Sequence, residues 1–153
     1  MKPGKPAPNS MEIRQAEALD CPVILDLLKN LKLPVEGVQE HLENFWVLSL
    51  GGKLSGVVGL EVYGRKALLR SLAVERSLQG KGYGTRLYRA ILEQARKRRI
   101  REVYLLTETA EAFFSARGFE KISRDQVDEA VKTSVEFSTA CPASAACMWM
   151  RLE

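Results

Sequence analysis

Residues 67–97 read ALLRSLAVERSLQGKGYGTRLYRAILEQARK, and three patterns follow one another in this stretch. The run 67–74 is mostly apolar, which predicts a buried strand. A short loop with glycine at positions 80, 82 and 84 comes next. From Leu87 to Ala95, apolar residues then recur at three- and four-residue spacing, which predicts an amphipathic helix. The stretch therefore predicts a strand, a glycine-rich loop and a helix in succession.

The remainder of the chain predicts further short strands and helices around this unit. Apolar and aromatic runs predict strands around residue 13 and at 45–50, 54–63, 103–107, 119–123 and 145–152. Capping residues and helical spacing predict helices after Asp20, at 36–43, at 110–116 and after Asp125. The first of these helices has Val23, Leu27, Leu28 and Leu31 on one apolar face. The sum predicts an α/β (α+β) fold, with a central mixed, mostly antiparallel sheet of about seven strands and helices on both faces.

Length and composition predict one globular domain. The chain has 153 residues, of which 46% are hydrophobic and 27% charged, as is typical of soluble proteins. Residues 1–10 contain three prolines and no apolar pattern, so we predict a tail there and a single domain over 11–153. No apolar run approaches the ~18–20 residues that a membrane helix needs, and the N-terminus lacks the apolar segment of a secretory signal. We predict a cytoplasmic protein with no membrane partner.

Charge and cysteine content narrow the expected ligands. The net charge of +4 fits an anionic ligand such as a nucleotide or coenzyme. The basic run 96–99, with Arg101, falls at the end of the predicted helix, where cations complement the dipole, so we predict a solvated helix end and no nucleic-acid partner. Three cysteines with His41 as the single histidine form no zinc-binding pattern, so we predict no metal.

The loop 79–85, QGKGYGT, is the part of the sequence that indicates a ligand. Glycines let backbone amides approach a phosphate closely, and a helix N-terminus adds partial positive charge. A P-loop is excluded, because G-x-x-x-x-G-K-[ST] is absent. A dinucleotide fingerprint is also excluded, because Thr85 stands where a third glycine is needed and the preceding strand belongs to an antiparallel meander.

The pattern Q-x-x-G-x-G after Leu72-Ala73-Val74 resembles the acetyl-coenzyme A signature of the GNAT acetyltransferase superfamily. A second segment, Ala110-x-x-Phe113-Phe114-x-x-x-Gly118-Phe119, resembles that family's A-x-x-F-[YF]-x-x-x-G-F element, and the order of elements agrees from residue 11 to residue 153. The resemblance implies acetyl-coenzyme A as co-substrate, a small amine as acceptor, no metal, and direct attack in a ternary complex. It also implies that the fourth and fifth strands splay apart to admit the thioester.

The resemblance assigns cofactor contacts residue by residue. The pyrophosphate would be held by the backbone amides of Gln79, Gly80, Lys81, Gly82, Tyr83, Gly84 and Thr85. Leu72, Ala73 and Val74 would pair with the pantetheine arm as an added half-strand, and the Val74 amide would donate to the thioester oxygen. Thr107, three residues before the second motif, and Phe113 within it are predicted to contact the cofactor.

The general acid and base are left open by the sequence. Phe114 stands where many relatives carry a tyrosine that protonates the leaving thiolate. Tyr104, Ser144, Cys141 and Cys147 are candidate acids, each with packing or loop structure as the alternative role. Glu61 is a candidate base that relays a proton through water, with a solvated strand glutamate as the alternative.

Candidate acceptor contacts also have two interpretations each. Arg70 interrupts an apolar strand, and a buried guanidinium needs a partner, which is either a substrate carboxylate or an internal salt bridge to Glu61. Cys141 and Cys147 are candidates for substrate contact or for capture of a thiophilic metalloid, and the alternatives are a disulfide or simple packing.

The segment 105–114, LLTETAEAFF, is similar to amino-acid N-acetyltransferases of the glutamate-acetylating type. The segments LRSLAV, LLTETA and CPASAACM resemble a GNAT subgroup named for its arsenic-resistance gene context. We therefore predict an N-acetyltransferase acting on an amino-acid-like amine. The alternatives are an acetyl-coenzyme A-binding regulatory module with little turnover, supported by Phe114, and a thiol-based metalloid binder. A homodimer is left open.

Overall fold

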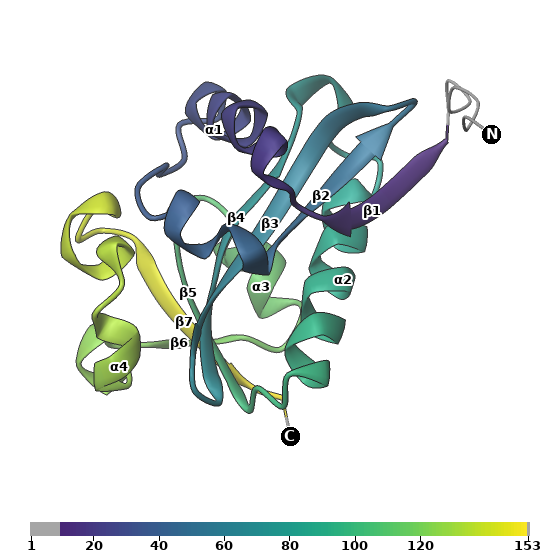
Figure 1. Cartoon of the computed structure of the whole chain (residues 1–153). Helices are drawn as coiled ribbons and strands as arrows, with labels where there is room; N and C mark the ends of the chain where they lie inside the picture. Colours follow the sequence, from purple (N-terminus) through teal and green to yellow (C-terminus); the bar gives the residue numbers. More distant parts are fainter. Residues whose placement is uncertain (1–9, 153) are drawn as a thin grey trace.

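The computed structural model describes residues 10–152, and its centre is one twisted sheet (Figure 1). Its seven strands lie in the order β1-β2-β3-β4-β5-β7-β6. Their bounds are β1 (Met11–Gln15), β2 (Phe45–Leu50), β3 (Lys53–Tyr63), β4 (Lys66–Val74), β5 (Glu102–Thr107), β6 (Glu120–Ile122) and β7 (Ala146–Arg151). All neighbours pair antiparallel except β4 and β5, which are parallel. The predicted mixed, mostly antiparallel sheet is confirmed.

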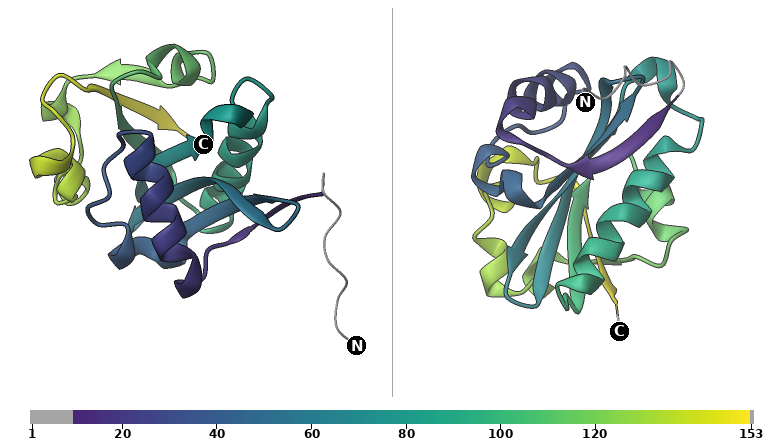
Figure 2. Two further views of the ribbon diagram at one scale, coloured as in Figure 1. Left: turned by 90° about the horizontal axis from the view of Figure 1, so that it is seen from above. Right: turned by 45° about the vertical axis from the view of Figure 1, so that its right-hand side comes forward.

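Helices cover both faces of the sheet, as predicted (Figure 2). The α-helices are α1 (Cys21–Asn30), α2 (Tyr83–Lys97), α3 (Glu111–Ser115) and α4 (Glu129–Lys132). Successive residues of a strand point to opposite faces, and this separates Val57, which packs with α1, from Val58, which packs with α2. Most of the apolar core lies between α2 and the sheet, where Leu87 and Ile91 are fully buried.

The α1 helix packs Leu27, Leu28 and Leu31 against the core as predicted, but not Val23. Ile24 and Leu28 are fully buried, whereas Val23 is 46% exposed. Two residues spaced i, i+4 lie on one side of a helix, so the contact with the sheet is centred on Ile24 and Leu28, and Val23 faces solvent.

Two predicted helices are replaced by shorter turns. The segment expected at 36–43 forms the 3₁₀ turn η2 (Gln39–Asn44). The helix expected after Asp125 is divided into η4 (Arg124–Gln126), the four-residue α4 and the π-helical turn η5 (Glu136–Ala140). The α4 cap is Asp128, whose Oδ1 accepts from the Ala130 N–H at 2.9 Å. Val127, between η4 and α4, is extended (φ −74°, ψ 141°) and buried, so the helix cannot continue from η4 into α4.

Residues 1–9 lie outside the described part of the chain, and so does most of the predicted tail 1–10. Ser10, at its end, accepts a backbone hydrogen bond from Gly51 at 2.9 Å. Two further turns are 3₁₀: η1 (Ala18–Asp20) before α1, and η3 (Arg76–Leu78) between β4 and the glycine loop.

The β4 and β5 strands separate after a short paired stretch. Their register runs from Lys66↔Glu102 to Leu68↔Tyr104 and ends there, although β4 continues to Val74 and β5 to Thr107. On its other edge β4 has a bulge against β3, and Ser71 has a positive φ of 62° in that bulge. The predicted splay between the fourth and fifth strands is confirmed, and it leaves one edge of each strand free for a ligand.

Candidate active site

A cavity of about 980 Å³ occupies the space between the separated ends of β4 and β5. One group of lining residues comes from the glycine loop and α2, and another from β4 between Leu69 and Val74. The opposite wall is formed by Leu105, Leu106 and Thr107 of β5, and α3, Cys141 and the segment 31–34 also line the cavity. The cavity therefore follows β4 from Arg70 to the loop at the start of α2.

The glycine loop has the geometry of an anion cradle. Gly80 and Gly82 have φ values of 80° and 89°, a backbone conformation that side chains other than glycine rarely adopt. No atom lies within 4 Å of a Cβ placed on either residue, so the space above the loop is open. Gly82 is the N-cap of α2, whose first-turn amides have no partner within the helix. The Gln79 Nε2 donates to the Val74 carbonyl at 2.9 Å and ties the loop to β4.

Lys81 differs from its neighbours in the loop. The other predicted cofactor residues line the main cavity: Leu72, Ala73, Val74, Gln79, Gly80, Gly82, Tyr83, Gly84, Thr85, Thr107 and Phe113. The Lys81 residue instead lines a separate hollow of about 450 Å³ together with Lys53, Ser55 and Glu75. Its predicted cofactor contact therefore has no support from the cavity.

Arg117 is a cavity residue that the sequence analysis did not identify. Its Nη2 donates to Thr85 Oγ1 at 3.0 Å, and its Nη1 donates to the Phe113 carbonyl at 2.8 Å. The guanidinium carbon lies 3.6 Å from the centre of the Phe113 ring. This cation is held rigidly beside the first turn of α2, where anionic groups of a ligand would lie. Its position just before Gly118 in the second motif was the only signal in the sequence.

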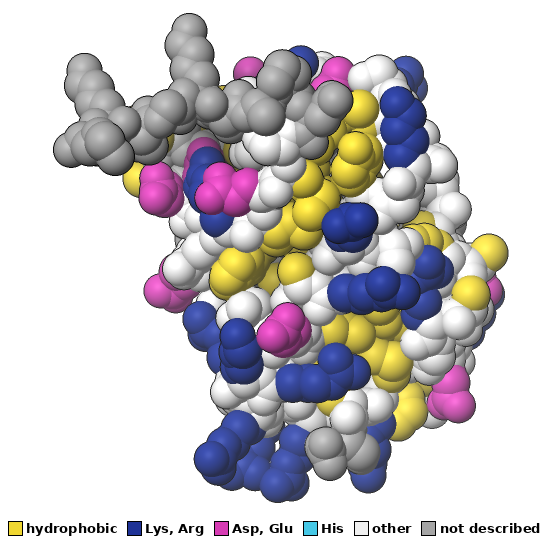
Figure 3. Space-filling view, turned by 90° about the vertical axis from the view of Figure 1, so that its right-hand side faces the viewer, with side chains coloured by type: hydrophobic (Ala, Val, Ile, Leu, Met, Phe, Trp, Pro, Cys, Tyr) yellow, Lys and Arg dark blue, Asp and Glu magenta, His cyan; other side chains and the backbone are white. Residues whose placement is uncertain are grey.

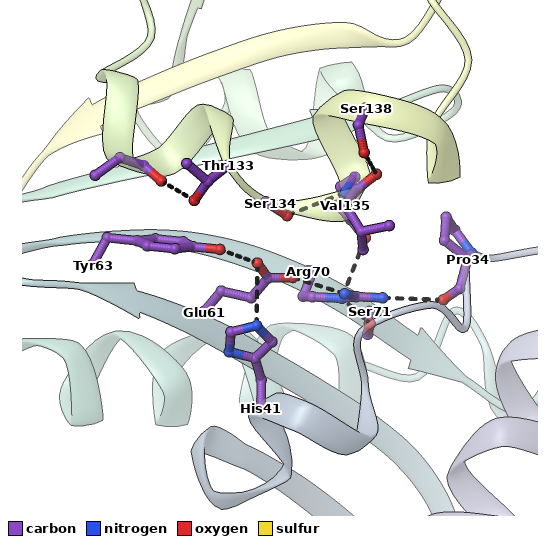
Figure 4. Close-up of polar contacts among 12 residues, drawn as sticks. Pro34, His41, Glu61, Tyr63, Arg70, Ser71, Thr133, Ser134, Val135 and Ser138 are labelled. Atoms are coloured by element: carbon purple, nitrogen blue, oxygen red, sulfur yellow. Dashed lines mark hydrogen bonds and ion pairs between the residues drawn. The ribbon is translucent and has the colours of Figure 1, made fainter.

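A buried polar network lies at the Arg70 part of the cavity (Figure 4). The Arg70 Nη1 donates to Glu61 Oε2 at 2.7 Å, which confirms the predicted salt bridge. The Nε of Arg70 also lies 3.2 Å from Glu136 Oε2, and its Nη2 donates to the Pro34 carbonyl at 3.4 Å. The guanidinium is 0% exposed, so these internal groups satisfy it.

Glu61 is buried rather than solvated. Its side chain is 1% exposed, accepts from the Tyr63 hydroxyl and has His41 Nε2 at 3.5 Å. Burial alone would raise the pKa of the Glu61 carboxyl, but hydrogen bonds from Tyr63 and Arg70 outweigh it and lower the pKa. Burial and the bond to Glu61 raise the pKa of Tyr63 to about 12. The predicted alternative of a solvated strand glutamate is wrong, because Glu61 neutralises Arg70 inside the protein.

Comparison with known proteins assigns the family. Residues 12–119 match the Acetyltransferase (GNAT) family, which is well over half of the chain. This chain is a member of the GNAT family. The family's two sequence elements correspond in the structure to the glycine loop and to α3, which line the same cavity.

Relatives and solved structures of the GNAT family agree with this assignment. An amino-acid acetyltransferase of Neisseria meningitidis is 30% identical in an alignment of 128 positions that covers 78% of this chain and 29% of that enzyme. This chain thus spans less than a third of that relative. An uncharacterised N-acetyltransferase of Chlorobaculum tepidum is 30% identical over 76% of this chain and 74% of its own length.

Solved structures extend the comparison to the fold. N-acetylglutamate synthase from Neisseria gonorrhoeae, complexed with coenzyme A and N-acetyl-glutamate, matches 94% of this chain and 35% of its own with a TM-score of 0.80 and 26% identity. A Mycobacterium tuberculosis protein solved with coenzyme A matches 93% of this chain and 99% of its own with a TM-score of 0.77 and 25% identity. The resemblance to the arsenic-resistance subgroup stays a prediction.

Three candidate acids of this GNAT protein lie away from the cavity. Tyr104 is 3% exposed and packs with Leu68 in an apolar cluster, because it belongs to the paired part of β5. Ser144 is exposed on the loop before β7 and does not line the cavity. Cys147 is 3% exposed and packs in the same cluster as Tyr104. The candidate base Glu61 is likewise absent from the cavity lining.

The cysteines are free thiols in this structure, and Cys141 lines the cavity. Burial raises the pKa of the Cys141 thiol to about 12, and nearby Glu136 adds to the shift. Burial also raises the pKa of Cys147. Both side chains therefore keep their protons at neutral pH, whereas metalloid capture needs thiolates. Within residues 10–152, no group of three or more His, Cys, Asp or Glu side chains is arranged to hold a metal.

The basic run after α2 is exposed, as expected for a solvated helix end. Figure 3 shows Lys and Arg side chains gathered on the face to which α2 contributes, and the residues 96–99 are all exposed. Among the described residues, no helix combines the length and apolar character required to cross a bilayer. Four expectations stay predictions: a cytoplasmic location, the absence of nucleic-acid and membrane partners, and a single domain over 11–153. The question of a homodimer stays open.

Proposed function

We propose that this protein transfers the acetyl group of acetyl-coenzyme A to the amine of a small, amino-acid-like molecule. The observation that carries the proposal is the cavity of about 980 Å³. Its lining includes both the glycine loop and the free edge of β4 as far as Arg70. A coenzyme with a phosphate-bearing part and a long arm fits such a path.

Different residues along the cavity have different roles in binding and transfer. The amides of Gly80 and of residues 82–85, with the Arg117 guanidinium, hold the pyrophosphate, and Leu72–Val74 pairs with the pantetheine arm. The Val74 amide donates to the thioester oxygen and stabilises the negative charge that forms when the amine attacks. Transfer is direct, because Cys141 is the one cavity cysteine and its raised pKa of about 12 makes it a poor nucleophile.

An amino-acid-like acceptor is supported by charge in the cavity wall. Lys32 lines the cavity near Pro34, and its exposed side chain offers a cation for an acceptor carboxylate. Arg70 is a second candidate, although a substrate would have to compete with Glu61 and Glu136 for its guanidinium. Two of the relatives, an amino-acid acetyltransferase and an N-acetylglutamate synthase, point to the same substrate class.

A screen of amino acids and small amines for coenzyme A release tests the proposal. Each amine is incubated with acetyl-coenzyme A, the released thiol is measured with a chromogenic disulfide, and mass spectrometry identifies the acetylated product. We expect turnover with at least one amino acid and none with the same acid blocked at its amine. Tight coenzyme A binding in calorimetry without turnover for any amine would instead support the regulatory module.

A further inference from the structure

Glu136 is a buried acid that the proposed mechanism does not use. It opens the turn η5, and its side chain is 4% exposed. Its backbone carbonyl accepts from the Cys141 N–H at 3.2 Å, and its own N–H donates to Ser134 Oγ at 3.2 Å. The turn therefore holds Glu136 and Cys141 together, although five positions separate them in the chain.

The charges around Glu136 come from four segments. Arg70 of β4 faces it at 3.2 Å, but the same guanidinium is already paired with Glu61 of β3 at 2.7 Å. Glu36, from the loop before η2, and Cys141, at the end of the turn, complete the set. One cation thus serves two buried carboxylates. Burial, above all, and the charges of Glu61 and Glu36 raise the pKa of Glu136 to about 7, against the opposing effects of Arg70 and Cys141.

Cys141 connects this acid to the cavity. Cys141 lines the cavity, whereas Glu136 does not. The Cys141 thiol stays protonated, because burial and the neighbouring Glu136 raise its pKa to about 12. A neutral thiol can donate its proton to one neighbour while its sulfur accepts a proton from another.

We propose that Cys141 and Glu136 form a proton relay that deprotonates the ammonium group of the acceptor. The inference rests on the proposed function, since it supplies the base that the acetyl transfer needs. Cys141 contacts the acceptor, and Glu136 acts through Cys141 as the proton store.

The proton balance of the relay is complete. One N–H bond of the ammonium breaks as the proton bonds to Cys141 Sγ, while the S–H proton passes to a carboxylate oxygen of Glu136. The neutral amine then forms a bond to the acetyl carbon, the carbon–sulfur bond breaks, and the sulfur leaves with the electron pair and takes up a second amine proton. Glu136 returns its proton to solvent along the same path. The α-ammonium of a free amino acid is a weaker acid than a chain N-terminus, whose pKa is about 7.7–8.0, so it is protonated at pH 7 and needs a base before it can attack.

The relay is tested by pH profiles of acceptor kcat/KM from pH 5.5 to 9.5 for Cys141→Ala, Cys141→Ser and Glu136→Gln. The acceptor is the amino acid that releases coenzyme A fastest in the screen above. Cys141→Ala and Glu136→Gln should lower kcat/KM by roughly 100-fold at pH 7, in the range expected for general base catalysis, with recovery towards pH 9.5, where the amine loses its proton unaided. Cys141→Ser keeps a donor and acceptor at the site and should retain most of the rate.

Cys21→Ala is the matched control, because Cys21 lies at the start of α1 and does not line the cavity. It should keep the wild-type profile. Equal losses at every pH, or a Cys141→Ala enzyme with the wild-type rate and profile, would overturn the relay and leave the acetyl transfer intact. A wild-type protein without turnover for any amine would overturn both proposals. The cysteine variants decide the matter even if Glu136→Gln folds poorly.

Discussion

Arg70 and Glu61 form an ion pair across 2.7 Å with both side chains at most 1% exposed. The two residues lie on neighbouring antiparallel strands and are nine positions apart in the chain. Removing one partner of such a pair leaves an unpaired buried charge, whose cost is far larger than that of a surface pair. Loss of either partner alone would therefore destabilise the sheet beside the cavity.

Arg70→Met should lower the free energy of unfolding by about 3–5 kcal/mol, because Glu61 and Glu136 both lose their cation. Thermal melts measure the effect. Arg14→Met is the matched control: Arg14 contacts Asp20 at the same 2.7 Å but is 31% exposed, so its loss should cost about 1 kcal/mol or less. An unchanged melting temperature with a raised acceptor KM would favour the substrate role of Arg70 instead.

Gly82→Val should weaken coenzyme A binding by roughly 10–150-fold, which corresponds to loss of a charge-assisted contact of ~1.5–3 kcal/mol. The φ of 89° is unfavourable for valine, and its side chain would enter the open space above the loop. Isothermal calorimetry gives the affinity. Gly64→Val meets a comparable φ of 66° with equally open surroundings in the β3–β4 turn, away from the cavity, and should lose stability without losing affinity.

Arg117→Met should reduce coenzyme A affinity by about tenfold or more and weaken its dependence on salt, because the guanidinium beside Thr85 is a fixed cation next to the expected phosphates. Calorimetry at two salt concentrations measures both effects. Arg86→Met removes a cation from the exposed face of α2 and should change neither. Equal losses in both variants would contradict a specific role for Arg117.

Glu136 should make stability fall as the pH rises from about 4.5 to 7. Burial raises its folded pKa from 4.5 to about 7, so in this window the folded state holds a proton that the unfolded state has released. The native state then loses up to ~3 kcal/mol as it is forced to ionise. Melting temperatures of Glu136→Gln across this range should show a flatter profile than the wild type. Parallel profiles would show that Glu136 titrates normally.

Local patterns in the sequence predicted the frame of the site. The glycine loop, α2 and the succession of strands along the chain depend on residue spacing and on the permitted φ values of glycine, and both can be read from neighbouring positions. The prediction of a continuous helix after Asp125 was wrong, because tertiary contacts that local patterns do not reveal decide the structure there. The valines of this segment have helical spacing, but Val127 and Val131 are buried under β4 and β5 by contacts that override local preference.

The sequence by itself determined the fold class and the glycine loop, because apolar periodicity and glycine positions are properties of the residues themselves. It also showed that a buried Arg70 needs a partner, but the structure identified that partner as Glu61. Only the tertiary structure decided which polar groups face the cavity. Arg117 reaches Thr85 across 32 positions, and Glu136 reaches Arg70 across 66, so neither contact leaves a trace in local spacing. The same folding turns Tyr104 and Cys147 into an apolar cluster and Cys141 towards the cavity, since the separation of β4 from β5 opens a cavity only beyond Leu68 and Tyr104.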